Sequence, residues 1–225
     1  MCGRYSLKTP ADTLAKHFRL SKVPSVSPHF NIAPTQPVAV VRISSPKGDR
    51  ECVQVCWGLI PSWAKDPGIG NKMINARAET VAEKPAFREA LARSRCLVPA
   101  DGYYEWQRED RRGRRKQPFY IRMRDEQPFA FAGLWERWMG PDGKAVETCA
   151  ILTTEPNELL KEIHDRMPVI LAQADYDQWL DLYIRQAALL QPLLRPYPPA
   201  DMTAYPVSLR VNDPSHDDAG CIEPL

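Results

Sequence analysis

The sequence predicts a single α+β domain, residues 1–225, in which an antiparallel or mixed, barrel-like β core is flanked by short helices. Hydrophobic residues make up 44% and charged residues 26% of the chain, which is an ordinary globular composition. Proline supplies 22 of the 225 residues, and because prolines interrupt helices, a helical bundle is disfavoured. The predicted strands mostly follow one another instead of alternating with helices, which favours an α+β fold.

The first half of the chain is predicted to open with a helix and continue as a β-hairpin. Thr9, Pro10 and Asp12 supply a cap, a first-turn proline and an acidic residue, so a helix is expected to run to about Leu20. Composition and alternation then predict six further segments. They are a loop at 21–34, hairpin strands at 37–43 and 51–57 around a turn at 45–49, a mostly irregular stretch at 58–75 and a helix at 84–94.

The second half of the chain is predicted to add most of the remaining strands. Short apolar runs bounded by turn residues predict strands at 96–98, 103–107, 119–123, 129–135, 148–153 and 203–209. Helices are expected to start at Pro156 and to cover 174–184 and 185–194. No linker, repeat or low-complexity segment divides the chain.

Charge and targeting signals narrow the class of protein. Thirty basic and 28 acidic residues leave a net charge of +2, so nucleic-acid binding would have to depend on a local patch. One basic run is either a solvated hairpin tip or a loop that contacts phosphate. It comprises Arg108, Arg111, Arg112, Arg114, Arg115 and Lys116. No signal peptide or membrane-spanning run is present, and a cytoplasmic protein is expected.

The cysteines are scattered and give no disulfide framework or zinc-ligand spacing. A reduced protein with no metal or cofactor is therefore expected. The six are Cys2, Cys52, Cys56, Cys96, Cys149 and Cys221.

Cys2 is the most informative position. Removal of Met1, which methionine aminopeptidases perform when the second residue is small, would leave an α-amine and a thiol on one residue. Their reference pKa values, about 7.7–8.0 and about 8.5, leave usable fractions of both nucleophiles at neutral pH. Such a 1,2-aminothiol condenses with an aldehyde to an imine and then closes to a thiazolidine, or the thiol alone attacks a carbonyl. A cysteine after Met1 also arises by chance.

Three further residue types point to acid–base chemistry and substrate orientation. Alternation along residues 103–106 places Glu105 on the face of Tyr103, where flanking aromatic residues can raise its pKa; the alternative is an exposed strand glutamate. His164 titrates near neutrality and can shuttle protons, or it is a structural histidine. Asn75 offers an amide to a polar substrate and Arg77 a guanidinium to phosphate. Each signal alone is weak.

Taken together, the motifs are specific. Six occur in order: MCGR (1–4), FNIAPTQ (30–36), WGLIPSW (57–63), NARAET (75–80), ADGYYEW (100–106) and IHDRMP (163–168). This set resembles the SRAP family, the SOS-response-associated peptidase-like proteins that crosslink to abasic sites in DNA. The resemblance covers essentially the whole chain.

The resemblance implies a role for each matching residue. Cys2 would bond the ring-opened sugar aldehyde, Asn75 would orient the cysteine or the sugar, Glu105 would act as acid and base, and His164 would shuttle protons. The matching positions that would line or grip DNA are Gly3, Arg4, Asn31, Arg77 and Arg166. Trp63 matches the region that would stack near the lesion and part the strands. A basic residue of some relatives is replaced here by Pro85, and Lys84 or Arg88 would take over its phosphate contact.

The implied function is that of an abasic-site DNA–protein crosslinking enzyme acting in the DNA-damage response. Its partner would be single-stranded DNA containing abasic sites, the protein would be monomeric, and it would associate with the nucleoid when bound to DNA. Imine formation is lyase-type chemistry, and self-removal of Met1 would be hydrolase chemistry. Two alternatives stay open: an N-terminal-nucleophile cysteine peptidase using the same Cys2, and a module that binds DNA without bonding to it.

Overall fold

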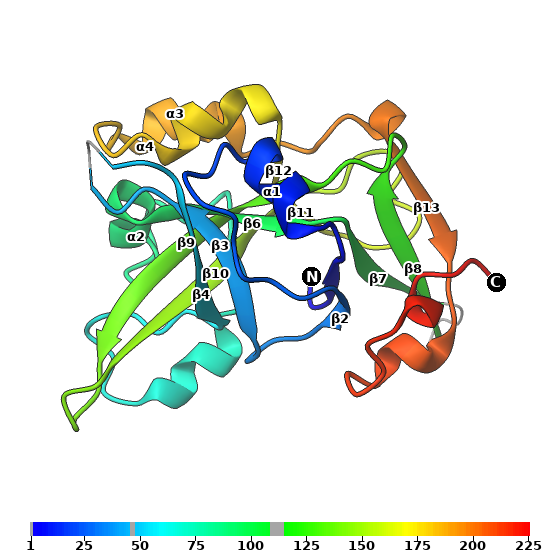
Figure 1. The fold of residues 1–225 in the computed structure, drawn as a ribbon, viewed down its shortest axis with the longest axis horizontal. Coiled ribbons are helices and arrows are strands. Elements are labelled where there is room, and N and C mark those ends of the chain that lie inside the picture. The colour runs from blue at the N-terminus through cyan, green and yellow to red at the C-terminus, as the bar shows by residue number, and fades with distance from the viewer. Residues whose placement is uncertain (1, 46–47, 109–114) are drawn as a thin grey trace.

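The computed structural model describes residues 2–45, 48–108 and 115–225. It contains a closed five-stranded β-barrel, on the left in Figure 1. Its strands in order are β10 (Ala145–Thr154), β4 (Glu51–Trp57), β3 (Pro37–Arg42), β6 (Arg95–Ala100) and β9 (Phe129–Met139). β9 pairs again with β10 and closes the barrel. The β10–β4 pair is parallel and the other pairs are antiparallel. The predicted α+β fold with a barrel-like core is confirmed, and the barrel is of the mixed kind.

A second, antiparallel sheet continues from the barrel. Its order is β13 (Met202–Pro206), β8 (Lys116–Met123), β7 (Gly102–Arg108), β1 (Tyr5–Leu7) and β2 (His29–Ile32). The chain passes from β6 of the barrel to β7 of this sheet at Asp101, whose carboxylate accepts hydrogen bonds from the backbone N–H groups of Lys8 and Thr9. The N-terminal segment thereby lies between the barrel and the second sheet (Figure 1).

Short elements complete the fold. Three strands extend the barrel sheet: β5 (Asn75–Arg77) and β11 (Met167–Pro168) pair with β10, and β12 (Ile170–Leu171) pairs with β9. The helices are α1 (Ala11–His17), α2 (Arg88–Arg93), α3 (Tyr176–Leu180) and α4 (Ala187–Leu190). The 3₁₀ turns are η1 (Pro67–Lys72), η2 (Gln173–Asp175), η3 (Gln191–Leu193), η4 (Pro199–Asp201), η5 (Leu209–Asn212) and η6 (Ala219–Cys221). Within the described ranges, no helix is long and apolar enough to cross a membrane.

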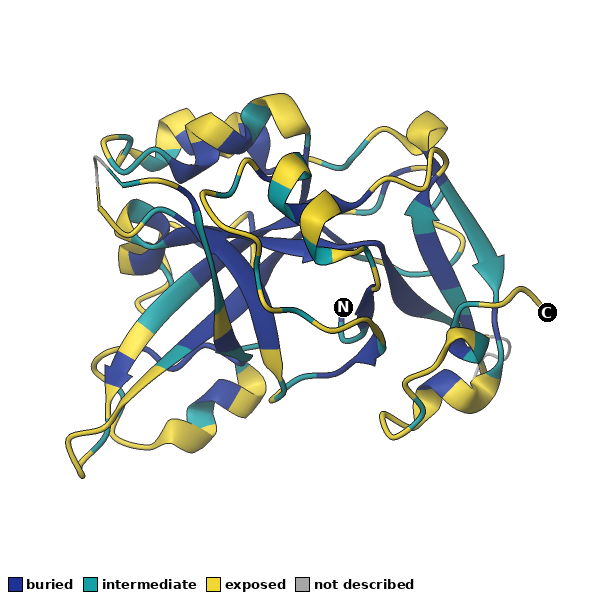
Figure 2. Cartoon of the chain, viewed as in Figure 1, coloured by how far each residue is buried: buried dark blue, intermediate teal, exposed yellow. Residues whose placement is uncertain are grey.

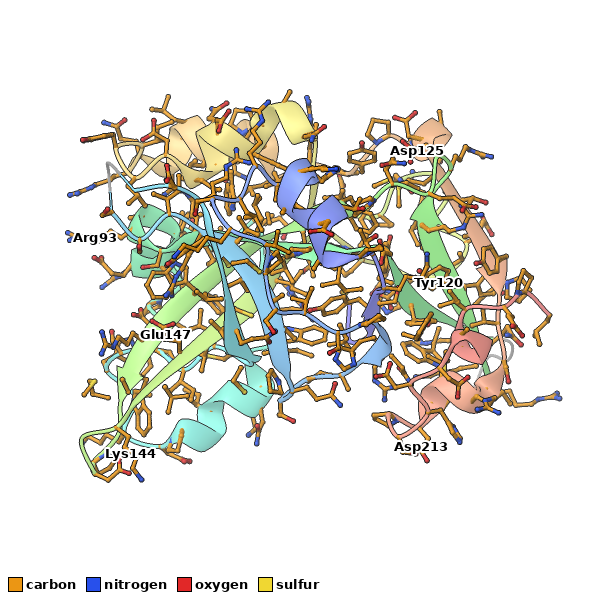
Figure 3. The ribbon with its side chains drawn as sticks, viewed as in Figure 1. Arg93, Tyr120, Asp125, Lys144, Glu147 and Asp213 are labelled. Atoms are coloured by element: carbon orange, nitrogen blue, oxygen red, sulfur yellow. The ribbon has the colours of Figure 1, made fainter. Side chains whose placement is uncertain are left out.

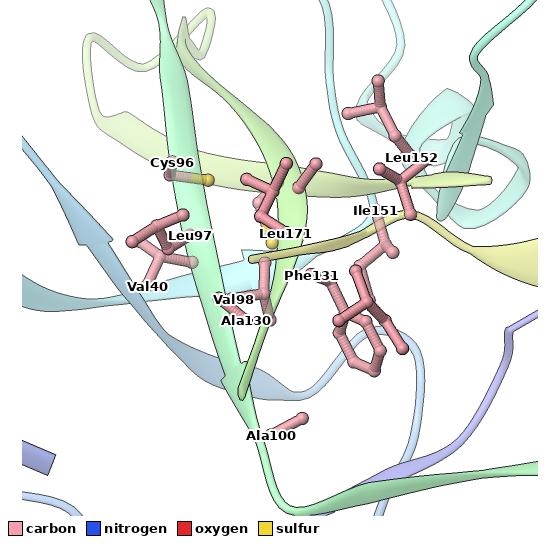
Figure 4. Close-up of a cluster of buried hydrophobic side chains, with 14 of the residues drawn as sticks. Val40, Cys96, Leu97, Val98, Ala100, Ala130, Phe131, Ile151, Leu152 and Leu171 are labelled. Atoms are coloured by element: carbon pink, nitrogen blue, oxygen red, sulfur yellow. The ribbon is translucent and has the colours of Figure 1, made fainter. Parts of the chain in front are cut away.

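Apolar side chains of the barrel strands fill one large core. Val40, Leu97, Val98, Phe131 and Ile151 are fully buried there (Figure 4). The strands are accordingly buried along most of their length, whereas the helices keep one exposed face (Figure 2). Charged side chains at the ends of the molecule point outward (Figure 3).

β7 separates the main core from a smaller one. Tyr103 belongs to the main core, and its neighbour Tyr104 packs in a second cluster with Tyr120, Val207 and Val211. The predicted alternation, with Tyr103 on one face and Tyr104 on the other, is confirmed. β7, the strand that carries Glu105, therefore packs against both cores.

Most predicted strands are confirmed, and the hairpin of β3 and β4 lies where it was expected. The predicted loop at 21–34 is wrong at its end, where β2 forms against β1. The helix predicted from Pro156 is also wrong: residues 158–163 form turns, because backbone bonds to Asn157 and Leu160 alternate between three- and four-residue spacing. The helices predicted at 84–94, 174–184 and 185–194 are shorter than expected.

The predicted basic run begins at the end of β7 and ends at the start of β8. Arg108 pairs with Lys116 at the ends of the two strands, and both are exposed, as is Arg115. The rest of the run, including Arg111, Arg112 and Arg114, lies outside the described residues.

Candidate functional site

Strand register brings Cys2 next to Glu105. Tyr5 of β1 lies opposite Tyr103 of β7, and the Tyr104 N–H donates to the Arg4 carbonyl at 3.0 Å. Cys2, three residues before Tyr5, is therefore held against β7 near Glu105, which shares a strand face with Tyr103. Both Cys2 and Glu105 are buried. The alternative of an exposed strand glutamate is wrong.

β10 positions the other two candidate catalytic residues. Its residues 151–153 pair in parallel with β5, which begins at Asn75. Its residues 153–154 pair with β11, just after His164. The Asn75 amide Nδ2 donates to the Cys2 carbonyl at 2.8 Å. The end of one barrel strand thus gathers an asparagine and a histidine that are far apart in the sequence.

Glu105 and His164 form a close acid–base pair. His164 Nε2 lies 3.6 Å from Glu105 Oε2, which is within ion-pair range but longer than a hydrogen bond. His164 Nδ1 accepts from the Arg166 backbone N–H at 3.0 Å and lies 3.0 Å from Asp165 Oδ1. Burial raises the pKa of Glu105 to about 7 and lowers the pKa of His164. At neutral pH, therefore, the carboxyl group holds a proton in part of the molecules and the imidazole is largely neutral.

The Cys2 thiol lies in an apolar, aromatic setting. Burial, and secondarily the charge of Glu105, raises its pKa well above the ordinary value. The ring of Tyr5 packs edge-on against Trp57 and Phe131, with centroids 5.4 and 5.8 Å apart. The thiol is therefore neutral in this state, and a base has to accept its proton before or while sulfur attacks.

Buried polar atoms around this cysteine remain available. Among the described residues, Asn75 Oδ1 and the hydroxyls of Tyr5 and Tyr103 have no hydrogen-bond partner. Burial raises the pKa of both tyrosine hydroxyls, and Cys2 lies close enough to each of them to add to the effect when its thiol ionises. Because a buried polar group without a partner is costly, these atoms mark where polar atoms of a ligand would bind. Sequence reasoning missed both tyrosines; their position opposite each other is visible only in the strand register.

Arg4 and Asn31 bind the chain's own C-terminal segment. Arg4 donates to Asn31 Oδ1 at 3.0 Å and to the carbonyls of Val211 and Asn212. Asn31 is buried, and its amide donates to the carbonyls of Val211, Asp213 and His216. Half-buried Gly3 joins Cys2 to Arg4. The structure thus gives Arg4 and Asn31 a structural role, and the DNA contacts expected of these three residues stay predictions.

Trp63 lies on an exposed surface together with Lys84 and Arg88. The Trp63 side chain is 59% exposed, and its indole N–H lies 3.5 Å from the Pro85 carbonyl. Lys84 and Arg88, both exposed, are one turn apart, since the Arg88 N–H donates to the Lys84 carbonyl at 2.9 Å. The structure therefore brings a large exposed aromatic ring beside two cations.

Arg77 is exposed, whereas Arg166 is held by other protein groups. Arg166 donates to both carboxylate oxygens of Glu79, at 2.7 and 2.9 Å, and to the Thr153 carbonyl at 2.7 Å. Glu79 belongs to the NARAET motif but carried no predicted role. Its spacing of two residues from Arg77 is the sequence signal that could have placed it beside this group.

A cavity of about 310 Å³ adjoins the site. Trp106 and Arg108 of β7 line one wall, and Lys161, His164 and Asp165 line the other. His164 is thus accessible from this cavity, whereas Glu105 is buried and does not line it. A further cavity of about 360 Å³, lined by His17, Tyr176 and Asp201 among others, includes none of the four candidate catalytic residues.

Comparison with known proteins identifies this architecture. A solved structure of a protein from Bacteroides thetaiotaomicron superposes with a TM-score of 0.87, is 30% identical, and is matched over 100% of both chains. A second, from Bordetella bronchiseptica, gives a TM-score of 0.78 at 28% identity and is matched over 92% of this chain and 100% of its own. The mixed barrel with its accessory sheet is thus a recurring bacterial fold.

The sequence comparisons assign the family. The chain is 44% identical to the "Abasic site processing protein YoqW" of Bacillus subtilis, over 99% of each chain. It is 29% identical to the "Abasic site processing protein HMCES" of Mus musculus, over 100% of this chain and 76% of that protein. Residues 1–214 match the family model described as SOS response associated peptidase (SRAP), and the chain belongs to this family. The resemblance drawn from the six motifs is confirmed.

Proposed function

We propose that this protein processes abasic sites in single-stranded DNA by forming a covalent thiazolidine between Cys2 and the ring-opened sugar. The observation that carries the proposal is that the Asn75 amide lies 2.8 Å from the Cys2 carbonyl, while Glu105, buried near Cys2, lies 3.6 Å from the half-buried His164. The names of the relatives, which describe abasic site processing, support the substrate class. Removal of Met1 would supply the free amine that the chemistry needs.

The sugar would first open to its aldehyde. Glu105, with a pKa of about 7, donates a proton to the ring oxygen as the bond from that oxygen to C1′ breaks. The C1′ hydroxyl loses its proton to His164, and C1′ becomes a carbonyl carbon. The proton can return from His164 to Glu105 across the 3.6 Å that separates them, with small rearrangement or through a water. Glu105 is then protonated and His164 neutral, as at the start.

The amine of Cys2 would react before its thiol. Burial keeps the thiol protonated, so the amine is the better nucleophile in this pocket. It adds to C1′, water leaves, and an imine forms. The sulfur then adds to the imine carbon, the proton of the thiol passes to the nitrogen, and a five-membered ring closes. One water is lost overall, and the ring nitrogen is no longer an imine that promotes strand scission.

The surrounding side chains would orient the reactants. The Asn75 amide N–H fixes the Cys2 backbone, while its oxygen and the Tyr5 and Tyr103 hydroxyls offer hydrogen bonds to the hydroxyls of the opened sugar. On the surface, Trp63 offers a stacking platform for a base, a feature typical of single-strand binding.

A denaturing gel with an abasic-site oligonucleotide tests this proposal. Wild-type protein should give a heat-stable, shifted band, and Cys2→Ser should not, because oxygen does not close the ring under mild conditions. Cys56→Ser is the matched control, since Cys56 is half-buried but internal, and it should crosslink normally. A wild-type protein that gives no shifted band overturns the proposal; cleavage of a peptide in a parallel assay would instead indicate a peptidase, and DNA binding alone a non-covalent module.

The mass of the adduct tests the thiazolidine itself. Protein plus oligonucleotide minus one water is expected, whereas simple addition of the thiol to the aldehyde loses no water. Insertion of one Ala between Met1 and Cys2 separates the amine from the thiol and should abolish the stable adduct. Substantial adduct from the insertion variant, without a reducing agent, would refute ring closure while leaving Cys2 as the nucleophile.

A further inference from the structure

Glu79 lies between two arginines that are candidates for binding the DNA backbone. Its carboxylate accepts hydrogen bonds from Nη1 and Nη2 of Arg166 at 2.7 and 2.9 Å. These hydrogen bonds hold the pKa of Glu79 below its ordinary value, and the charge of Arg77 adds to the effect. Glu79 is therefore ionised at neutral pH and places a negative charge within a basic group of residues.

The contact between Glu79 and Arg166 has the geometry of a phosphate contact. A guanidinium binds carboxylate and phosphate through the same pair of parallel N–H groups. The Arg166 side chain is only 18% exposed, and on its inner side it donates to the Thr153 carbonyl of β10 at 2.7 Å. The Glu79 side chain, 49% exposed, occupies its outer side. A DNA strand that approached Arg166 from solvent would therefore meet the Glu79 carboxylate first.

We propose that in the free protein the Glu79 carboxylate occupies the position on Arg166 that a DNA phosphate takes in the complex. It holds Arg166 in binding geometry and is displaced when a strand binds. The inference rests on the proposed function, since it takes Arg166 to contact the DNA backbone. Arg77, two residues away on β5, is the nearby cation toward which the displaced carboxylate can turn.

Because a DNA phosphate has to displace the Glu79 carboxylate, the affinity of the protein is lowered for every strand, damaged or intact. In the complex a carboxylate and a phosphate compete for one guanidinium, and like charges brought together weaken association. An undamaged strand is held only by such reversible contacts and dissociates more readily. An abasic strand is retained by its covalent bond to Cys2, which the competition cannot reverse. Glu79 thus favours damaged over intact DNA without contacting the lesion.

The test measures reversible binding and crosslinking separately. In the Cys2→Ser background, fluorescence anisotropy gives the Kd for an undamaged single-stranded oligonucleotide. Glu79→Gln, which keeps the shape and removes the charge, should tighten binding about threefold to tenfold. Glu79→Asp, which keeps the charge, should bind within about twofold of the parent. Glu126→Gln is the matched control, because it removes one charge from another arginine pair, with Arg122 at 3.0 Å, and should leave the Kd unchanged.

The salt dependence separates displacement from a structural role. If Arg166 still reaches a phosphate in Glu79→Gln, the log–log slope of affinity against salt stays at the parent value. If Glu79 merely keeps Arg166 in place, its loss weakens binding and reduces the slope by about 0.7, the amount expected for one phosphate contact to a single strand. Equal or weaker binding by Glu79→Gln therefore overturns the inference.

A competition assay reads out the consequence for selectivity. Undamaged competitor strand should inhibit crosslinking of an abasic oligonucleotide more strongly with Glu79→Gln, in the presence of Cys2, than with wild type; equal inhibition would contradict the inference. The proposed function fails separately, if wild-type protein forms no crosslink at all, and the Kd comparison would then still decide whether Glu79 competes with DNA.

Discussion

Replacing Glu105 by Gln tests whether burial controls the acid–base chemistry of the site. The Glu105 side chain is 2% exposed, and its burial raises the pKa to about 7 from the ordinary 4.5. Between these two pH values the folded protein keeps a proton that the unfolded chain has released. The free energy of unfolding of the wild type therefore falls as the pH rises through this window, and the loss is complete above about pH 7.

The gap between about 7 and 4.5 corresponds to roughly 3 kcal/mol. Gln has nearly the same shape and no titratable proton, so this pH dependence is absent from Glu105→Gln. The variant should thus gain about 3 kcal/mol relative to the wild type between about pH 4.5 and pH 8. Urea unfolding followed by tryptophan fluorescence, at several pH values across this range, measures the difference directly.

His164 contributes with the opposite sign and has to be controlled. Because burial lowers its pKa, the unfolded chain binds a proton more readily, and stability from this group is lost as the pH falls below about 6.5. The effect is common to wild type and Glu105→Gln except for the coupling across 3.6 Å. Repeating the comparison in a His164→Gln background removes that coupling. Parallel stability curves for the two proteins, or a wild type that gains stability with pH, would refute the reasoning.

Three further perturbations have definite expected outcomes. Arg77→Ala should weaken binding to single-stranded DNA of any sequence and lower the log–log salt slope by about 0.7; an unchanged slope would mean that Arg77 touches no phosphate. Asn31→Ala should lower the free energy of unfolding by about 1–3 kcal/mol, because it removes the donor to three backbone carbonyls; unchanged urea unfolding would contradict this. Gly102→Ala should destabilise by about 1–3 kcal/mol or more, since its Cβ would lie 2.3 Å from Tyr120 Cζ; a wild-type melting temperature would show that the ring moves freely.

The sequence predicted those parts of the fold that are determined by residues close together in the chain. The hairpin of β3 and β4 follows from two alternating runs around a turn, and the two faces of β7 follow from the alternation of Tyr103, Tyr104 and Glu105. The strands β1, β2 and β5 went unpredicted because they contain three or four residues, too few to show a period. β1 and β5 form because the longer strands β7 and β10 offer them backbone partners, and β2 then pairs with β1.

The helix expected from Pro156 shows tertiary structure overriding a local signal. Asn157 uses its side chain to bind the Tyr197 carbonyl at 2.7 Å and the Leu160 N–H at 3.0 Å, and the chain must turn toward β11 only a few residues later. The segment therefore closes as turns that place His164 against Glu105. The sequence of residues 156–163, taken alone, does not specify this turn of the chain toward β11.

The motifs located the candidate catalytic residues, but the chemical properties of these residues arise only on folding. Cys2, Asn75, Glu105 and His164 come from four separate segments, and two of the links between them are made by the end of β10, which pairs with β5 and with β11. Burial between the barrel and the second sheet then raises the pKa of the Cys2 thiol and of Glu105 and lowers that of His164. A motif can name a carboxylate, but whether it holds a proton at neutral pH depends on the surrounding packing. A substitution that loosens the pairing of β1 with β7 should therefore impair the site without altering any of these four residues, because water would reach Glu105 and return its pKa toward the ordinary value.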